Sequence, residues 1–224
     1  MSEVMDRIER VKMRICRACD RAGRPEASVR LLAVSKKKPA DAVEQAWQGG
    51  LCFFGENRVQ EAAEKIPLTP SGTAWHLIGH LQSNKAKLAA NLFDMIQSVD
   101  SIKLIEALNR HAQQTLPMLL QVNIAGEGAK FGFSPHEVAE AIRYANSTAH
   151  CEVHGLMLIP PFTPNPEEAR AYFKALRLLR DEVSEKTETP LPELSMGMSN
   201  DLEVAIEEGS TWVRVGTDIF GERA

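Results

Sequence analysis

The sequence predicts an α/β fold, a single (β/α)8 barrel of the TIM type with one extra helix at its N-terminus. Three observations favour this class. Short apolar runs alternate with amphipathic helical patterns along the chain, which is typical of right-handed βαβ units and a parallel sheet. Eight such runs are present, and the 224 residues exceed the roughly 200 from which closed barrels are built. An open, doubly wound sheet remains the alternative.

The first elements show the alternation. A helix is expected over residues 3–22, because its apolar positions recur at helical spacing and a Gly and a Pro follow it. Those positions are Val4, Ile8, Val11, Ile15 and Ala18. Residues 31–35 form the first strand, and Pro39 begins the next helix. The apolar face of that helix is expected to consist of Val43, Ala46 and Trp47.

The same pattern predicts the remaining elements. Strands are expected at residues 52–54, 75–78, 95–99, 118–124, 153–159, 193–195 and 211–215. Helices are expected at residues 58–65, 85–92, 102–114, 135–145, 166–185 and 201–208. No internal repeat, Pro/Gly-rich linker or shift in composition divides them. We therefore expect one domain over residues 1–224.

Composition excludes several classes of protein. The chain is 44% hydrophobic and 25% charged, with a net charge of −4, which excludes an intrinsically disordered chain. No block of Lys and Arg indicates a nucleic-acid partner, and no apolar run approaches the ~18 residues of a membrane span. Four cysteines make no disulfide framework, and the N-terminus is charged where a secretory signal is apolar. We expect a cytoplasmic protein.

Candidate chemistry is concentrated in the loops after the last two strands. In barrels, functional groups follow the C-terminal ends of strands, and the loops after strands seven and eight commonly bind phosphate. Gly197 and Ser199 in one loop, and Gly216 and Thr217 in the other, let main-chain N–H groups approach an anion. We expect Ser199 to open a helix, whose positive end would face the same anion. The alternative is that these are ordinary turn and capping residues.

Lys36 directly follows the first strand. At the open end of a barrel, desolvation would lower the pKa of its amine, and the neighbouring Lys37 and Lys38 would act in the same direction by repulsion. Such an amine is a nucleophile toward aldehydes and forms a Schiff base. A solvated basic turn is the alternative interpretation.

Two pairs with metal or redox spacing carry little weight. Cys16 and Cys19 lie inside a predicted helix, whereas redox CxxC motifs follow a strand. His76 and His80 have the spacing of a zinc-binding helix, but residues 75–78 read as a strand. We expect no metal site.

Five ordered motifs resemble those of one family, the pyridoxal phosphate homeostasis proteins. They are LAVSK at 32–36, FGENRVQE at 54–61, WHLIGHLQSNK at 75–85, LSMGMSND at 194–201 and VRVGTDIFG at 213–221. The resemblance extends over roughly residues 31–223. It implies the barrel of the alanine racemase N-terminal domain, with pyridoxal 5'-phosphate (PLP) bound at the C-terminal ends of its strands.

Residue roles follow from the resemblance, motif by motif. It implies that Lys36 forms the Schiff base and that Ser199, Gly216 and Thr217 bind the phosphate, with Met198 beside them. It also implies that Asn57 lies near the ring, that His76 neighbours the pocket, and that Arg214 faces the pyridine nitrogen. No cofactor position departs from the family pattern.

Strand alternation independently predicts that Arg214 points into the barrel, opposite to Val213 and Val215. A cation at the ring nitrogen discourages protonation of that nitrogen and weakens the cofactor as an electron sink.

The leading hypothesis is therefore a non-catalytic protein that holds PLP and supports vitamin B6 homeostasis, with no catalytic residue assigned. Its expected partners are PLP and the PLP-dependent apoenzymes that would receive it, and we expect a monomer.

The alternative is a PLP-dependent amino-acid racemase. Racemases add a β domain with a second proton-transfer group, a tyrosine, whereas Tyr144 and Tyr172 here fall in predicted outer helices. A class I aldolase with a Schiff-base lysine is a third hypothesis.

Overall fold

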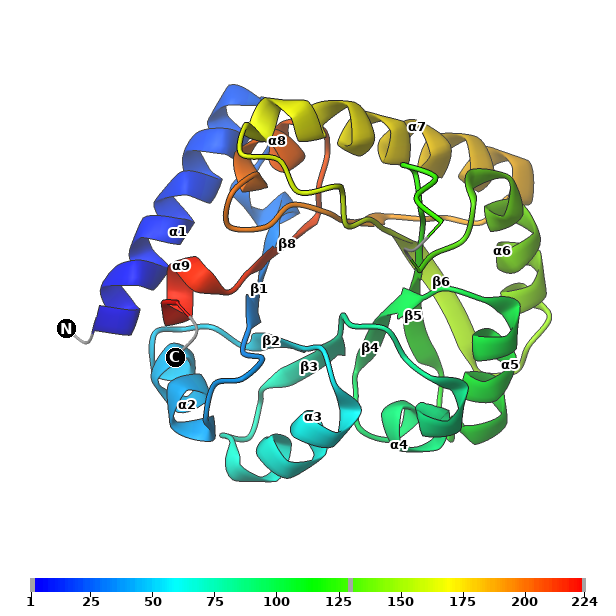
Figure 1. Ribbon diagram of the computed structural model, residues 1–224, viewed down its shortest axis with the longest axis horizontal. Coiled ribbons are helices and arrows are strands. Elements are labelled where there is room, and N and C mark those ends of the chain that lie inside the picture. The colour runs from blue at the N-terminus through cyan, green and yellow to red at the C-terminus, as the bar shows by residue number, and fades with distance from the viewer. Residues whose placement is uncertain (1–2, 129–130, 223–224) are drawn as a thin grey trace.

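The computed structural model describes residues 3–128 and 131–222 and has the predicted architecture. Eight parallel strands, β1 to β8, pair in chain order, and β8 returns to β1 to close a barrel. The strands surround the centre of the molecule and the helices lie outside them (Figure 1). The predicted fold class, a (β/α)8 barrel with an extra N-terminal helix, is confirmed, and the open-sheet alternative is wrong.

The elements have the following bounds. The strands are β1 (Arg30–Val34), β2 (Phe53–Glu56), β3 (Ala74–Leu77), β4 (Met95–Val99), β5 (Leu116–Gln121), β6 (Cys151–Met157), β7 (Glu193–Ser195) and β8 (Trp212–Val215). The α-helices are α1 (Glu3–Arg21), α2 (Ala40–Gln48), α3 (Val59–Lys65), α4 (Ala86–Ala90), α5 (Ile102–His111), α6 (Val138–Asn146), α7 (Arg170–Thr187), α8 (Leu202–Glu207) and α9 (Thr217–Phe220). Short 3-10 turns are η1 (Glu26–Ser28), η2 (Ile66–Leu68), η3 (Ser83–Lys85), η4 (Pro135–Glu137) and η5 (Pro166–Ala169).

Most predicted boundaries agree with these to within a few residues. The helices expected from residues 135 and 166 begin with the 3-10 turns η4 and η5. In α2, Val43 and Ala46 are fully buried, but Trp47 is 41% exposed. The expectation that Trp47 belongs to the apolar face was wrong, because only the small and branched residues of this short helix reach the barrel.

Alternation along the strands separates two cores. Side chains that point outward pack under the helices in one large cluster that includes Ala33, Phe54 and Val213. Side chains that point inward fill the barrel in two smaller clusters, one of Leu32, Val34, Ile78 and Trp212 and one of Met95, Leu119 and Met157. Because the barrel centre is filled, a ligand has to bind at the strand ends rather than pass through.

The extra helix α1 covers the part of the barrel where the chain ends. Ile8, Val11, Ile15 and Ala18 are buried, as their spacing predicts, and α1 packs against α8 and α9. Within the described ranges, no helix has both the length and the apolar character that a membrane span requires.

Candidate functional site

The closure of the barrel places the loop after β1 beside the loop after β8. Ala33 is in register with Val215, so Lys36 and Thr217 follow at similar heights on neighbouring strands. A Cβ atom on Gly216 would lie 3.2 Å from the Val34 carbonyl oxygen. The absence of a side chain at residue 216 therefore allows this close approach of the two chains.

The loop after β7 joins the same edge. The Arg214 N–H donates to the Gly197 carbonyl at 3.0 Å, and Gly197 has φ +91°. A Cβ on Gly197 would lie 2.5 Å from the Ala205 Cβ, so glycine is required there both by backbone conformation and by packing.

The turn that contains Ser199 is fixed by Asp201. The Met198 N–H donates to Asp201 Oδ1 at 2.6 Å, and the Asp201 N–H donates back to the Met198 carbonyl at 3.1 Å. Because this closed turn occupies residues 198–201, α8 begins only at Leu202. The expectation that Ser199 opens a helix is therefore wrong. The main-chain N–H groups of Ser199 and Asn200 have no acceptor within residues 3–128 and 131–222.

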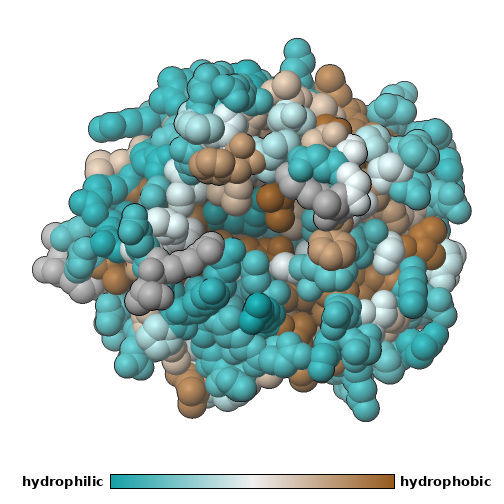
Figure 2. Space-filling view, in the orientation of Figure 1, coloured by the Kyte–Doolittle hydropathy of each residue, from teal (hydrophilic) through white to brown (hydrophobic). Residues whose placement is uncertain are grey.

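Lys36 lies in the turn after β1 and is partly buried. It lines a cavity of about 200 Å³ together with Lys37, Asn57, Arg58 and Glu61. The face of the barrel seen in Figure 2 is hollowed near its centre, where apolar residues are visible within a largely polar rim.

A buried ionic cluster holds the residues on both sides of Lys36. Ser35 Oγ donates to Glu56 Oε1 at 2.7 Å, and Lys65 Nζ donates to the Ser35 carbonyl at 2.9 Å and to Glu56 Oε1 at 2.5 Å. The Lys37 N–H donates to Glu61. Desolvation raises the pKa of Glu56, although Lys65 and Ser35 oppose the shift. Nothing in the sequence marks Lys65 as buried, so its role was missed.

A chain of hydrogen bonds crosses the inside of the barrel and ends on Arg214. Its guanidinium donates to Ser195 Oγ at 2.7 Å and to the Leu158 carbonyl at 2.8 Å. Ser195 Oγ donates to Gln97 Oε1 at 2.6 Å, and Gln97 Nε2 lies 2.8 Å from His76 Nδ1. All four side chains are buried. Arg214 points inward, as strand alternation predicts.

Burial decides the charge of the two residues at the ends of this series of hydrogen bonds, Arg214 and His76. It lowers the pKa of Arg214 to about 10, which still leaves the guanidinium charged at neutral pH, and Asp201 opposes the shift. Burial lowers the pKa of His76 to about 3, so the imidazole is neutral and its Nδ1 accepts from Gln97. The His76 ring packs 4.7 Å, centroid to centroid, from that of Trp212.

The other predicted site residues lie around this edge. Asn57 follows β2, and its Oδ1 is buried without a hydrogen-bond partner among the described residues. Met198 and Ser199 are partly exposed and Thr217 is exposed. His76 lies inside the barrel and connects to Arg214 only through Gln97 and Ser195.

The two histidines with metal-like spacing have separate partners, since His80 Nδ1 lies 2.8 Å from Asp100 Oδ2 and His76 lies against Gln97. The described part of the chain holds no group of three or more His, Cys, Asp or Glu suited to a metal ion.

The site thus combines a primary amine, main-chain donors in two loops and a buried arginine at adjacent strand ends. A ligand that fits this set carries an electrophilic carbon for the amine, an anionic group for the N–H donors and an acceptor for the guanidinium. Asn57 Oδ1 adds an acceptor that has no hydrogen-bond partner in the described part of the chain.

Comparisons with known proteins point to one family. The model of the alanine racemase N-terminal domain matches residues 8–224. The pyridoxal phosphate homeostasis protein of Aquifex aeolicus is 43% identical over 222 residues, which cover 97% of each chain. That of Pseudomonas aeruginosa is 42% identical over 227 residues, covering 100% of this chain and 97% of its own.

Solved structures agree. PipY of Synechococcus elongatus PCC7942, with PLP bound, is 37% identical over 98% of this chain and 100% of its own, with a TM-score of 0.85. Alanine racemase from Corynebacterium glutamicum is 17% identical, with a TM-score of 0.70, over 95% of this chain and 60% of its own, a likeness of fold alone. The chain belongs to the pyridoxal phosphate homeostasis protein family, built on the barrel of the alanine racemase N-terminal domain.

Proposed function

We propose that this protein binds PLP at the C-terminal edge formed by β1, β7 and β8 and holds it without robust turnover, in support of vitamin B6 homeostasis. In this proposal Lys36 forms a Schiff base with the cofactor's aldehyde, and one water leaves as the carbon–nitrogen double bond forms. Ser199, Gly216 and Thr217 bind the phosphate beside Met198. Arg214 faces the pyridine nitrogen, and Asn57 lies near the ring.

The observation that carries the proposal is the position of Lys36 at the same barrel edge as the loops after β7 and β8. In the β7 loop, the Ser199 and Asn200 N–H groups have no acceptor among the described residues. The register between Ala33 and Val215 sets the turn that contains Lys36 beside the loop after β8, and the Arg214 N–H ties the β7 loop to β8. Membership of a family whose relative PipY binds PLP supports the same ligand.

Bound PLP supplies an aldehyde carbon and a ring that can delocalise electrons. The residues of this chain limit the second property. Arg214 is held by Ser195 and the Leu158 carbonyl and stays charged, so it donates to the ring nitrogen and opposes its protonation. His76 is neutral, so it adds no second positive charge at this end of the site.

The decisive experiment locates the covalent bond. We expect the purified protein to be yellow and borohydride to fix the cofactor on Lys36, as read by absorbance and peptide mapping. Lys36→Ala should lose the visible band and retain weaker, phosphate-anchored binding. Lys37→Ala and Lys38→Ala are the matched controls, because they remove the same charge one and two residues away. A label on Lys37 or Lys38 with none on Lys36 would contradict the assignment.

A second experiment separates a holding protein from a racemase. Racemisation needs an acid–base group on each face of the substrate α-carbon. Lys36 serves one face, whereas Tyr144 and Tyr172 lie in α6 and α7, packed against the outer core. We expect no inversion of alanine or serine, measured by chiral analysis with solvent-deuterium exchange. Inversion near the median enzymatic rate of about 10 per second would overturn the non-catalytic part of the proposal, with His80 the first residue to examine.

We further propose a monomer in the cytoplasm that hands PLP to apoenzymes, in accord with the composition. Sedimentation of the purified protein tests the monomeric state, and a dimer would contradict it.

A further inference from the structure

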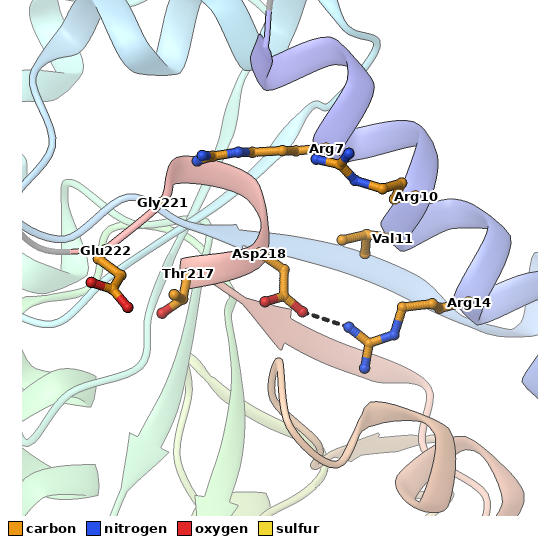
Figure 3. A pocket seen from close by; sticks show the side chains of 8 residues that line it. All are labelled: Arg7, Arg10, Val11, Arg14, Thr217, Asp218, Gly221 and Glu222. Atoms are coloured by element: carbon orange, nitrogen blue, oxygen red, sulfur yellow. Dashed lines mark hydrogen bonds and ion pairs between the residues drawn. The ribbon is translucent and has the colours of Figure 1, made fainter.

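Arg14 on α1 contacts three segments around the candidate site: the loop after β7, α8 and α9. Its Nη2 donates to the Ser199 carbonyl at 2.8 Å. Its Nη1 donates to Asp218 Oδ2 at 2.5 Å, the bond drawn as a dashed line in Figure 3. Its Nε and Nη2 also donate to Glu203, at 2.6 and 2.9 Å. One side chain therefore ties α1 to the loop after β7, to α8 and to α9.

The bond to Ser199 sets the direction of a main-chain donor. In a planar trans peptide, the carbonyl of one residue and the N–H of the next point in opposite directions. Because the Ser199 carbonyl points back to Arg14, the Asn200 N–H points away from α1. That N–H has no acceptor among the residues that the structure describes.

The bond to Asp218 offsets negative charge that would oppose an anion. Asp218 directly follows Thr217, so its carboxylate lies next to a residue proposed to bind phosphate. The single positive charge of the guanidinium is shared between this carboxylate and that of Glu203, so it offsets one of the two negative charges near the site. Hydrogen bonding to Glu203 raises the pKa of Arg14, so the guanidinium keeps its positive charge at neutral pH.

We infer that Arg14 is a positioning residue for the phosphate end of the site, where it orients the Ser199–Asn200 peptide and reduces the negative charge that Asp218 places beside Thr217. This inference rests on the proposed function. It also assigns α1, which the sequence indicates only as an additional helix, a part in ligand binding. Since neither effect reaches the ring or Lys36, loss of Arg14 should weaken a phosphorylated ligand and spare its unphosphorylated analogue.

The chain offers a matched control on the same helix. Arg10 and Arg14 both line a cavity of about 460 Å³ between α1 and α9 (Figure 3). Arg10 is the control. It is exposed and makes no ion pair within the described ranges. Arg10→Met therefore removes one positive charge from this cavity without removing a contact to either loop.

The experiment measures dissociation constants for PLP and for pyridoxal, which lacks the phosphate, in the full-length variants. Arg14→Met should raise the constant for PLP about tenfold, which corresponds to about 1.4 kcal/mol, and leave that for pyridoxal nearly unchanged. Arg10→Met should change neither appreciably, because solvent ions screen an exposed charge. Adding Asp218→Asn to Arg14→Met should restore part of the PLP affinity.

Two results would overturn the inference: equal weakening of PLP and pyridoxal, or equal effects of Arg14→Met and Arg10→Met. If Arg14→Met does not fold, Arg14→Lys is measured instead, because lysine keeps the positive charge but lacks the planar guanidinium that bonds to several acceptors at once. If the ratio of PLP affinity to pyridoxal affinity in Arg14→Lys equals that of the wild type, the inference is overturned. Wild-type protein that binds neither ligand would instead refute the proposed function.

Discussion

Ser195 is the central link of the hydrogen-bond chain inside the barrel, and its removal should be unusually costly. Ser195→Ala leaves a buried guanidinium N–H of Arg214 and the buried Oε1 of Gln97 without a partner. A hydrogen bond to a charged group contributes about 1.5–3 kcal/mol and a neutral one about 1 kcal/mol. The free energy of unfolding should therefore fall by about 2.5–4 kcal/mol.

Ser98 provides the control. It is also fully buried, but among the described residues its Oγ bonds only to the neutral Gly79 carbonyl, at 2.6 Å. Ser98→Ala loses the same atom and should cost about 1 kcal/mol. For a chain of this length, each kcal/mol lowers the melting temperature by about 2–4 °C. Urea and thermal denaturation of the two apo variants should therefore separate them clearly.

A double-mutant cycle identifies the cause. In an Arg214→Met background, Ser195→Ala should cost only about 1 kcal/mol, because the charged donor is already gone and the Gln97 bond alone is lost. Equal costs for Ser195→Ala and Ser98→Ala, or the same cost of Ser195→Ala with and without Arg214, would refute the reasoning.

The remaining predictions concern pH and phosphate binding. The folded pKa of His76 is about 3 against an ordinary 6.5, so the unfolded chain binds a proton that the folded chain does not, and stability falls as pH drops from 6.5 toward 3. Between pH 6 and 4.5, the free energy of unfolding from urea denaturation should fall more steeply in the wild type than in His76→Asn, by up to about 1.4 kcal/mol per pH unit. The same pH dependence of the unfolding free energy in both proteins would contradict this. Ser199→Ala and Thr217→Val should each weaken PLP binding by about 1.5–3 kcal/mol without lowering the urea midpoint, because both side chains are at least partly exposed. Normal binding by both variants would mean that the phosphate lies elsewhere.

Several features of the site follow from local sequence. Strand and helix alternate with periods that the apolar residues display, so the barrel could be predicted, as could the inward direction of Arg214 between Val213 and Val215. Lys36, Gly216 and Thr217 could be placed at strand ends for the same reason. The inferences about single residues need only one element and its adjoining loop, whereas the barrel follows from the repeated alternation of strands and helices along the chain.

Other features depend on contacts between distant segments, which only the tertiary structure decided. Arg14 meets Ser199 and Asp218 across 185 and 204 residues of chain, and Ser195 meets Gln97 across 98. The late start of α8 is a local exception, because it depends on the Asp201 carboxylate accepting from the Met198 N–H three residues earlier, a bond that helical periodicity does not encode. The sequence by itself therefore determined the barrel and which residues stand at its edge. Because hydrogen bonds between side chains from different strands require the closed barrel, only the fold decided how those residues are held, charged and oriented.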